Sequence, residues 1–402
     1  MTRVLHIVKT SNGARWAALQ AAELVRRGLD VHVALPDLQG RTVQEWERAG
    51  VTIHVAELDV PVRSIWELPE VHRRTRRLVE EVKPDLIHTH HVGVTVALRG
   101  ALRNTTPIPR VFQVAGPLHL EHSLPRLLEI SSAGANDYWI CTSRCIFKLY
   151  EKAGISTERL FLSYAGTDVD TYSTGRTGVL RRLLGIDEND IVVGNINFIY
   201  APKRYLGQRI GLKCHEDVID AIAEARKAEP RIVGVLAGGS WGNSQRYERR
   251  LRARAEMLGK GRIIMPGFLP IESVRQAWPD FDCAVHVPLT ENCGGCLEPL
   301  LCAVPTIGGR IGGLPELVID GVTGTTVAIR QPGELAQAIL EVVSNLAHYR
   351  ALANNGRQLV RTMFDVERTA AEVHQVYEHI LGRAPRPVSF SSQEAIASLS
   401  VS

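Results

Sequence analysis

The sequence lacks long apolar runs and has little excess charge. No stretch of its 402 residues approaches the ~18 consecutive apolar residues that a membrane-spanning helix needs. The apolar run near Met1 is too short for a signal peptide, so we expect a cytoplasmic protein. The formal net charge of +4 is small for this length. It permits ligands that carry phosphate, but it does not indicate a protein that binds nucleic acid.

Cysteine is scarce as well, and its pattern excludes the usual cysteine chemistry. Seven cysteines, an odd number without a secretory signal, indicate free thiols in a reducing compartment. The CGGC stretch at 293–296 is followed by no second cysteine pair or histidine at zinc-site spacing. It also lies deep in a large chain, whereas a redox motif opens a helix in a small thioredoxin-like domain. We therefore expect no metal or redox role for Cys293 and Cys296.

Histidines gather at two places, HTHH at 88–91 and HLEH at 119–122. Together they resemble a metal-binding set, because His88 and His90 share one strand face. The alternative is that these histidines stand at strand tips and line a cleft, without a metal. We favour that interpretation and expect no metal ligand in the chain.

The sequence also lacks a G-x-G-x-x-G motif after any predicted strand, which argues against a nicotinamide-dependent oxidoreductase. What it contains is a regular alternation of short apolar runs and amphipathic helical segments. This alternation predicts parallel sheets covered by helices on both faces. The predicted strands are 3–8, 30–36, 84–90, 110–116, 137–143 and 159–166 in the first half, and 190–198, 231–239, 262–268 and 281–289 in the second.

The restart of the pattern at residue 190 predicts two domains. We expect an α/β fold of two doubly wound, Rossmann-like domains that face each other across a cleft. The first covers 1–175, and the second covers 186–363. A final helix at 364–383 crosses back towards the first domain, and we expect 384–402 to be a disordered tail because apolar periodicity fades there.

In open parallel sheets, ligands bind beyond the carboxyl ends of the strands. The stretch TENCGGCLEPLLCAV, which starts at Thr290, fits this position because it follows the predicted strand 281–289. Gly294 and Gly295 would let the backbone approach a ligand closely. Glu298 would lie in the first turn of the following helix, where Pro299 is tolerated. The glutamates and glycines therefore carry the expected chemistry.

A family resemblance follows from this stretch. Residues 291–324, ENCGGCLEPLLCAVPTIGGRIGGLPELVIDGVTG, resemble the donor-site region of retaining GT-B glycosyltransferases of the GT4 type. That region has two glutamates around a glycine-bearing loop, then a helix, a G-x-P-x-I strand, and GG-x-x-E and DG-x-x-G turns. PDLIHTH at 84–90, YAGTDVDTY at 164–172 and GLKCHEDVIDAI at 211–222 are similar to three further family elements. The resemblance covers nearly the whole chain.

The resemblance implies a nucleotide-sugar donor site in the second domain. Lys213 matches the lysine that contacts the diphosphate, and Glu291 resembles the glutamate near the donor sugar, which makes both candidate catalytic residues. Glu298 matches the glutamate that holds the ribose hydroxyls. The other donor-binding residues that we expect are Asn292, Cys293, Gly294, Gly295, Arg204, Gly238 and Phe268.

This sequence departs from the family in several places, among them Cys214, which stands where glycine is common after the lysine. The two glutamates are seven positions apart instead of eight, and Thr290 stands at the standard place. The chain inserts 200–210 before Lys213, so the second diphosphate cation stays open among Lys203, Arg204 and Arg209, with Arg204 preferred. The family histidine after the fifth strand is replaced by Ala115 or Gly116.

The acceptor side is expected in the first domain. Gly13 stands where the family has its first glycine-rich loop, and Arg15 follows it. His119 takes over the role of the replaced family histidine in this interpretation. A basic helical run at 71–83 is interpreted as a solvated face, with contact to an anionic membrane surface at the inner face as the alternative.

We therefore expect a retaining, metal-independent glycosyltransferase that needs no cofactor. The donor is a nucleotide sugar, and we favour a UDP-sugar. The acceptor is a polysaccharide, a lipid-linked glycan or a small metabolite. Two alternatives remain: a non-hydrolysing nucleotide-sugar epimerase of the same fold, and a sugar-binding protein without catalysis.

Overall fold

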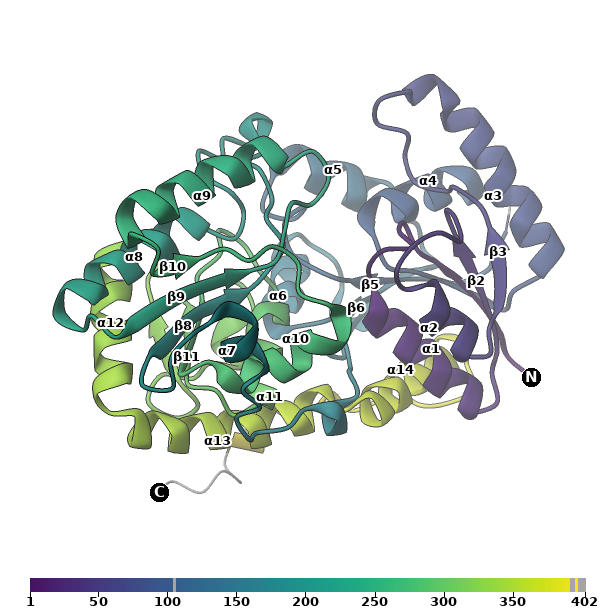
Figure 1. Cartoon of the computed structure of the whole chain (residues 1–402). Helices are drawn as coiled ribbons and strands as arrows, with labels where there is room; N and C mark the ends of the chain where they lie inside the picture. Colours follow the sequence, from purple (N-terminus) through teal and green to yellow (C-terminus); the bar gives the residue numbers. More distant parts are fainter. Residues whose placement is uncertain (104–105, 391–394, 397–402) are drawn as a thin grey trace. The chain divides into compact units, whose positions relative to one another are not determined.

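The computed structural model describes residues 1–103, 106–390 and 395–396. The chain forms two compact units (Figure 1), one of Met1–Val169 with Met363–Ser391 and the other of Asp170–Thr362. Each is built around one parallel sheet, so the predicted fold class of two Rossmann-like domains is confirmed. The boundary lies at 169/170, a few residues before the predicted end of the first domain at 175.

The first unit contains a 7-stranded parallel sheet in the order β3-β2-β1-β4-β5-β6-β7. Its strands are β1 (Arg3–Ile7), β2 (Asp30–Leu35), β3 (Thr52–Val55), β4 (Leu86–Thr89), β5 (Arg110–Val114), β6 (Asp137–Cys141) and β7 (Leu160–Leu162). Its α-helices are α1 (Arg15–Arg26), α2 (Val43–Arg48), α3 (Leu68–Val82), α4 (Val92–Leu102), α5 (Ser123–Ser131), α6 (Arg144–Lys152) and α14 (Val366–Ile380).

Helices cover both faces of this sheet, as Figure 1 shows. Val4 packs with apolar residues of α1 and α14, whereas its neighbour Leu5 packs with α3 and α4. Successive side chains of a strand point to opposite faces, and burial of both faces explains the continuous apolar runs. Asp365 caps α14, because its carboxylate accepts a hydrogen bond from the Arg368 amide at 2.7 Å.

The second unit contains a 6-stranded parallel sheet in the order β10-β9-β8-β11-β12-β13. Its strands are β8 (Ile191–Ile196), β9 (Ile232–Ala237), β10 (Ile263–Ile264), β11 (Cys283–His286), β12 (Thr306–Gly309) and β13 (Thr325–Val327). Its α-helices are α7 (Val179–Leu184), α8 (His215–Ala228), α9 (Gln245–Gly259), α10 (Ile271–Ala277), α11 (Gly294–Leu301), α12 (Pro332–Ser344) and α13 (Leu346–Phe364), the last of which ends in the first unit.

The strand order decides where a ligand site can form. It reverses between β1 and β4 in the first sheet and between β8 and β11 in the second. At such a switch point the connections leave in opposite directions, and a crevice opens beyond the carboxyl ends of the strands. The loops after β8 and β11 are therefore the natural place for a ligand in the second unit.

Several local expectations differ from the structure. The short strand β3 was not predicted, because its partly exposed sequence TIHV has no long apolar run. Helix α11 begins at Gly294, so Glu298 and Pro299 lie beyond its first turn, contrary to expectation. In the predicted tail, Arg386 donates hydrogen bonds to the carbonyls of Thr157, Glu158 and Leu160. Residues 391–394 and 397–402 of that tail lie outside the described residues.

In the part of the chain that the structure describes, no helix has both the length and the apolar character required to cross a bilayer.

Candidate active site

The carboxyl ends of β8 and β11 bring together a lysine, a glutamate and a histidine. Lys213 lies just before α8, and its Nζ forms an ion pair with Glu291 Oε2. His286, the last residue of β11, has its Nε2 atom 2.9 Å from the same oxygen. The backbone ties these loops together, since the Leu289 amide donates to the Leu212 carbonyl at 2.9 Å. The structure thus joins the two predicted catalytic residues, and it adds His286.

The orientation of the His286 ring is defined by a fourth residue. The Asn197 side-chain amide nitrogen lies 3.2 Å from His286 Nδ1. Because an amide N–H donates, Nδ1 accepts and the ring proton sits on Nε2, from which it is donated to Glu291. Asn197, His286, Glu291 and Lys213 therefore form one continuous polar chain.

The charged groups of this polar assembly influence one another. Burial by itself would raise the pKa of the Glu291 carboxyl, but the neighbouring Lys213 and the His286 hydrogen bond reverse this and lower it well below its usual range. Burial lowers the pKa of His286, the Glu291 hydrogen bond opposes that change, and Lys213 adds to it. At neutral pH Glu291 is therefore a carboxylate and His286 is a neutral imidazole.

Two glycines allow this arrangement. A Cβ atom at Gly295 would lie 1.9 Å from His286 Nε2, and one at Gly312, where φ is +58°, would lie 1.8 Å from the Glu291 carbonyl oxygen. By contrast, a Cβ at Gly294 would meet no atom within 4 Å. Of the two glycines that we expect to let the backbone approach a ligand closely, only Gly294 has open space beside it. The space beside Gly295 is filled by His286.

Glu298 is held by two residues that the sequence did not indicate. The Tyr172 hydroxyl donates to Oε1 at 3.0 Å, and the Trp278 indole N–H donates to Oε2 at 3.1 Å. Both donors come from segments distant in the chain, so only the folded structure brings them to the carboxylate. Each oxygen keeps a second lone pair, which leaves Glu298 able to accept hydrogen bonds from ribose hydroxyls.

The two cysteines of the loop do not expose their thiols. Cys293 and Cys296 are buried free thiols, and burial raises the pKa of Cys296 far above its usual value. Cys293 Sγ lies 3.6 Å from the Gly313 carbonyl oxygen. Asn292 is likewise buried, and its backbone N–H donates to Glu291 Oε1 at 3.1 Å. A buried protonated thiol is a poor nucleophile and a poor metal ligand.

The remaining predicted donor residues lie in three loops around the assembly of Lys213, Glu291 and His286. Gly238 has φ +112°, and a Cβ there would lie 2.0 Å from the Asn197 carbonyl, so its first role is to let two loops approach. Phe268 is 54% exposed and belongs to an aromatic cluster with Phe198, whose ring lies 5.9 Å away. Arg204 is exposed in the 3-10 turn Arg204–Leu206, and no described contact joins it to Glu291 or Lys213.

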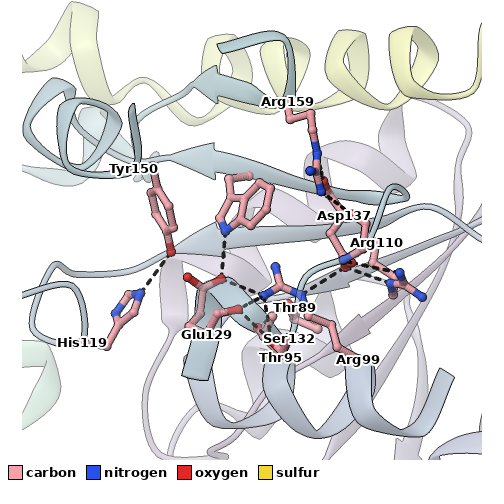
Figure 2. Close-up of polar contacts among 12 residues, drawn as sticks. Thr89, Thr95, Arg99, Arg110, His119, Glu129, Ser132, Asp137, Tyr150 and Arg159 are labelled. Atoms are coloured by element: carbon pink, nitrogen blue, oxygen red, sulfur yellow. Dashed lines mark hydrogen bonds and ion pairs between the residues drawn. The ribbon is translucent and has the colours of Figure 1, made fainter. Parts of the chain in front are cut away.

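The predicted acceptor residues lie in the first unit. Gly13 precedes α1, and Arg15 forms an ion pair with Glu45 at 3.4 Å. His119 has its Nε2 atom 3.0 Å from the Tyr150 hydroxyl (Figure 2). The structure does not join His119 to Gly13 or Arg15 through any described contact.

Beside His119 lies a buried ionic network (Figure 2). Arg99 donates to Glu129 at 2.8 Å and to Asp137 at 3.1 Å, and Asp137 also accepts two hydrogen bonds from Arg110. Glu129 is the only buried side chain of α5. Because the leucines of α5 are exposed, this helix is held to the rest of the unit by the Arg99–Glu129 ion pair and not by an apolar face.

The sequence suggested that the histidines at 88–90 line a cleft. The structure buries His88 and His90 instead. His88 and His90 are fully buried and meet His6 under α1 and α14, where Tyr377 bonds to His88 and the Trp16 ring contacts His90. One nitrogen of each of the three rings lies within 4.8 Å of the others, which is the one metal-like grouping among the described residues. No carboxylate belongs to it, and burial lowers the pKa of each ring, so the three histidines are neutral imidazoles. The expectation that they hold no metal stays a prediction.

Comparison with known proteins matches a different family to each unit. Residues 13–171 match the family described as Glycosyltransferase Family 4, and residues 205–359 match Glycosyl transferases group 1. Together these matches account for most of the chain and place one domain type in each unit. The chain belongs to the GT4-type glycosyltransferase family. The resemblance inferred from the donor loop is thereby confirmed at the level of the family.

Curated relatives of this family member include the D-inositol 3-phosphate glycosyltransferase of Actinosynnema mirum. It is 26% identical over 279 residues, which is 67% of this chain and 61% of the relative. The protein of the same name from Geodermatophilus obscurus is 26% identical over 77% of this chain and 64% of its own length. The chain thus spans about three fifths of the length of these relatives.

Solved structures with the same fold include Anabaena HepE in complex with UDP-glucose. It superposes with a TM-score of 0.79 at 21% identity, over 94% of this chain and all of HepE. The sucrose-phosphate synthase of Thermosynechococcus elongatus gives a TM-score of 0.76 at 18% identity, over 95% of this chain and all of that one. At such identities the likeness establishes the GT-B fold.

Proposed function

We propose that this family member transfers a sugar from a nucleotide-activated donor, first of all a UDP-sugar, to a carbohydrate, lipid-linked or small-metabolite acceptor. The observation that carries the proposal is the Lys213–Glu291–His286 assembly at the switch point of the second sheet. It supplies a cation for phosphate and a carboxylate for sugar hydroxyls at the edge where parallel sheets bind ligands. The UDP and UDP-glucose bound by HepE support this donor class.

In the proposed reaction the diphosphate leaves as an anion, and the sugar carbon becomes positively charged in the transition state. Lys213 would stabilise the departing diphosphate, and the backbone N–H groups that begin α11 would add to the positive potential. Glu291 would position the sugar, and Glu298 the ribose. Attack from the face that the diphosphate leaves would retain the anomeric configuration without a covalent nucleophile.

We propose that transfer needs no metal ion, because basic side chains can neutralise the diphosphate. On the acceptor side, Gly13, Arg15 and His119 remain the proposed contacts. The basic residues of α3 would favour an anionic membrane surface if the acceptor is carried by a lipid.

The test is a screen of nucleotide sugars for thermal stabilisation, followed by transfer assays with the donor that binds. A ligand at a hundredfold excess over its Kd should add about 2.7 kcal/mol of stability. Product analysis by NMR should show retained anomeric configuration, and a chelator should leave the rate unchanged. An inverted product would refute the mechanism. An epimerised donor formed without any acceptor would instead identify an epimerase.

A further inference from the structure

The polar chain at the donor site contains a charge conflict. Lys213 is paired with Glu291 in the free protein, and each side chain is only 14% exposed. The proposed function, on which this inference rests, requires the same ammonium to contact a diphosphate. A diphosphate carries more negative charge than one carboxylate, so a bound donor draws Lys213 away from Glu291. Glu291 then loses the partner that compensates its buried charge.

His286 is placed to compensate that loss. Its ring is 3% exposed and lies 2.9 Å from the Glu291 carboxylate. In the free protein, burial and the nearby Lys213 both disfavour the imidazolium. When Lys213 moves to the diphosphate, a repelling cation leaves the pair, and an unneutralised carboxylate remains in contact with Nε2. Both changes favour the charged ring.

We infer that His286 takes up a proton from solvent when a nucleotide diphosphate binds, so that Glu291 stays anchored and neutralised while Lys213 holds the phosphates. The proton adds to Nδ1, because Nε2 already carries the hydrogen that is donated to Glu291. The Asn197 carboxamide then turns so that its oxygen accepts the new N–H. No other bond forms or breaks.

The surroundings of the ring support this assignment. Among the described residues, the other titratable groups that act on this assembly include His215 at the start of α8, which is neutral because burial lowers its pKa to about 3, and Cys296, whose buried thiol stays protonated. Tyr200 also feels the Glu291 charge, and burial together with that charge raises its pKa to about 12, so it stays neutral. None of them can supply the positive charge that Glu291 requires. Gly295 preserves the contact, since a Cβ there would fall 1.9 Å from His286 Nε2. His286 is therefore a positioning residue for Glu291.

The first measurement uses UDP as the probe. Its binding to the full chain is followed by calorimetry in buffers of different ionisation enthalpy, which reports the number of protons taken up. We expect the wild type to take up close to one proton more than His286→Asn, and His348→Asn, which removes an exposed histidine on α13, to behave as the wild type. Equal proton uptake by the wild type and His286→Asn would overturn the inference.

The second measurement needs no ligand. Lys213→Met removes the ammonium, as donor binding would, and the protonation of His286 is followed by NMR of its ring nitrogens across pH 5–9. We expect the pKa of His286 to rise relative to the wild type, and Asn197→Asp to raise it as well. An unshifted His286 in Lys213→Met would overturn the inference whether or not a nucleotide binds. If no nucleotide binds, the proposal of a nucleotide-sugar donor is refuted. The titration of His286 in Lys213→Met still tests this inference, because it needs no nucleotide.

Discussion

At the scale of single residues, the proposed donor site depends on contacts between side chains that the sequence places far apart. Glu298 illustrates this, because Tyr172 and Trp278 hold its carboxylate from two other segments. A residue matched to a family motif acquires its orientation only from such partners. The two predictions at this scale therefore concern one proposed ligand contact and one steric requirement.

Glu298→Ala should weaken UDP binding by about 10-fold or more, because hydrogen bonds to a charged group contribute roughly 1.5–3 kcal/mol. Calorimetric titration with UDP measures the change. Glu341→Ala, on the exposed side of α12, is the matched control and should bind UDP as the wild type does. An unchanged affinity in Glu298→Ala would remove this residue from the ribose site.

Gly295→Ala should destabilise the second unit by about 1–3 kcal/mol, the usual cost of forcing an extra methyl into packed space. The new methyl would overlap His286 Nε2. Gly294→Ala is the control, since it adds the same methyl at the neighbouring helix position, where no atom lies within 4 Å. Urea unfolding of both variants tests the prediction, and equal stability of the two would contradict it.

At the scale of elements, α5 is unusual because its buried side chain is a glutamate. Glu129 accepts hydrogen bonds from Arg99 and from the Trp139 indole, at 2.8 and 3.0 Å (Figure 2). A helix held in this way depends on one ion pair, whereas α1 or α14 depends on many apolar contacts spread along its length. Loss of one partner should therefore affect α5 far more than an average charge deletion would.

Arg99→Met should lower the stability of the first unit by about 3–5 kcal/mol, because it leaves the buried Glu129 carboxylate without its charge partner, while Asp137 keeps Arg110. Hydrogen exchange should increase first in α5. Adding Glu129→Gln to this variant should restore part of the loss, since it removes the uncompensated charge. Arg73→Met on the exposed face of α3 is the control, as it breaks only a surface pair with Glu70. A loss as small as that of the control would refute the anchoring role.

At the scale of the whole molecule, each unit buries a histidine whose protonation is strongly disfavoured in the folded state. Burial lowers the pKa of His6 in the first unit and of His215 in the second to about 3. In the unfolded chain both groups titrate near pH 6.5. Between pH 6.5 and about 3 the unfolded chain therefore binds protons that the folded protein does not, and stability falls as the pH falls.

Each of these histidines should cost about 1.4 kcal/mol of stability per pH unit below 6.5. Urea unfolding at pH 7.5 and pH 5 should show a clear decrease for both units. His348→Gln, which removes an exposed histidine, is the control and should leave the pH dependence of the unfolding free energy unchanged. His215→Gln should reduce that pH dependence for the second unit. Equal stability at the two pH values would contradict the prediction.

The sequence by itself determined the fold class and the donor loop. Alternating strands and helices follow from local periodicity, and the glycines and glutamates of 291–298 are contiguous in the chain. Only the tertiary structure decided how these residues are used. It placed His286 against Glu291, where it occupies the space beside Gly295 that had been expected for a ligand, and it buried His88 and His90 instead of exposing them. The reason is physical: these contacts depend on strand order and on which face of a sheet a side chain occupies, and both are set by packing between segments distant in the sequence.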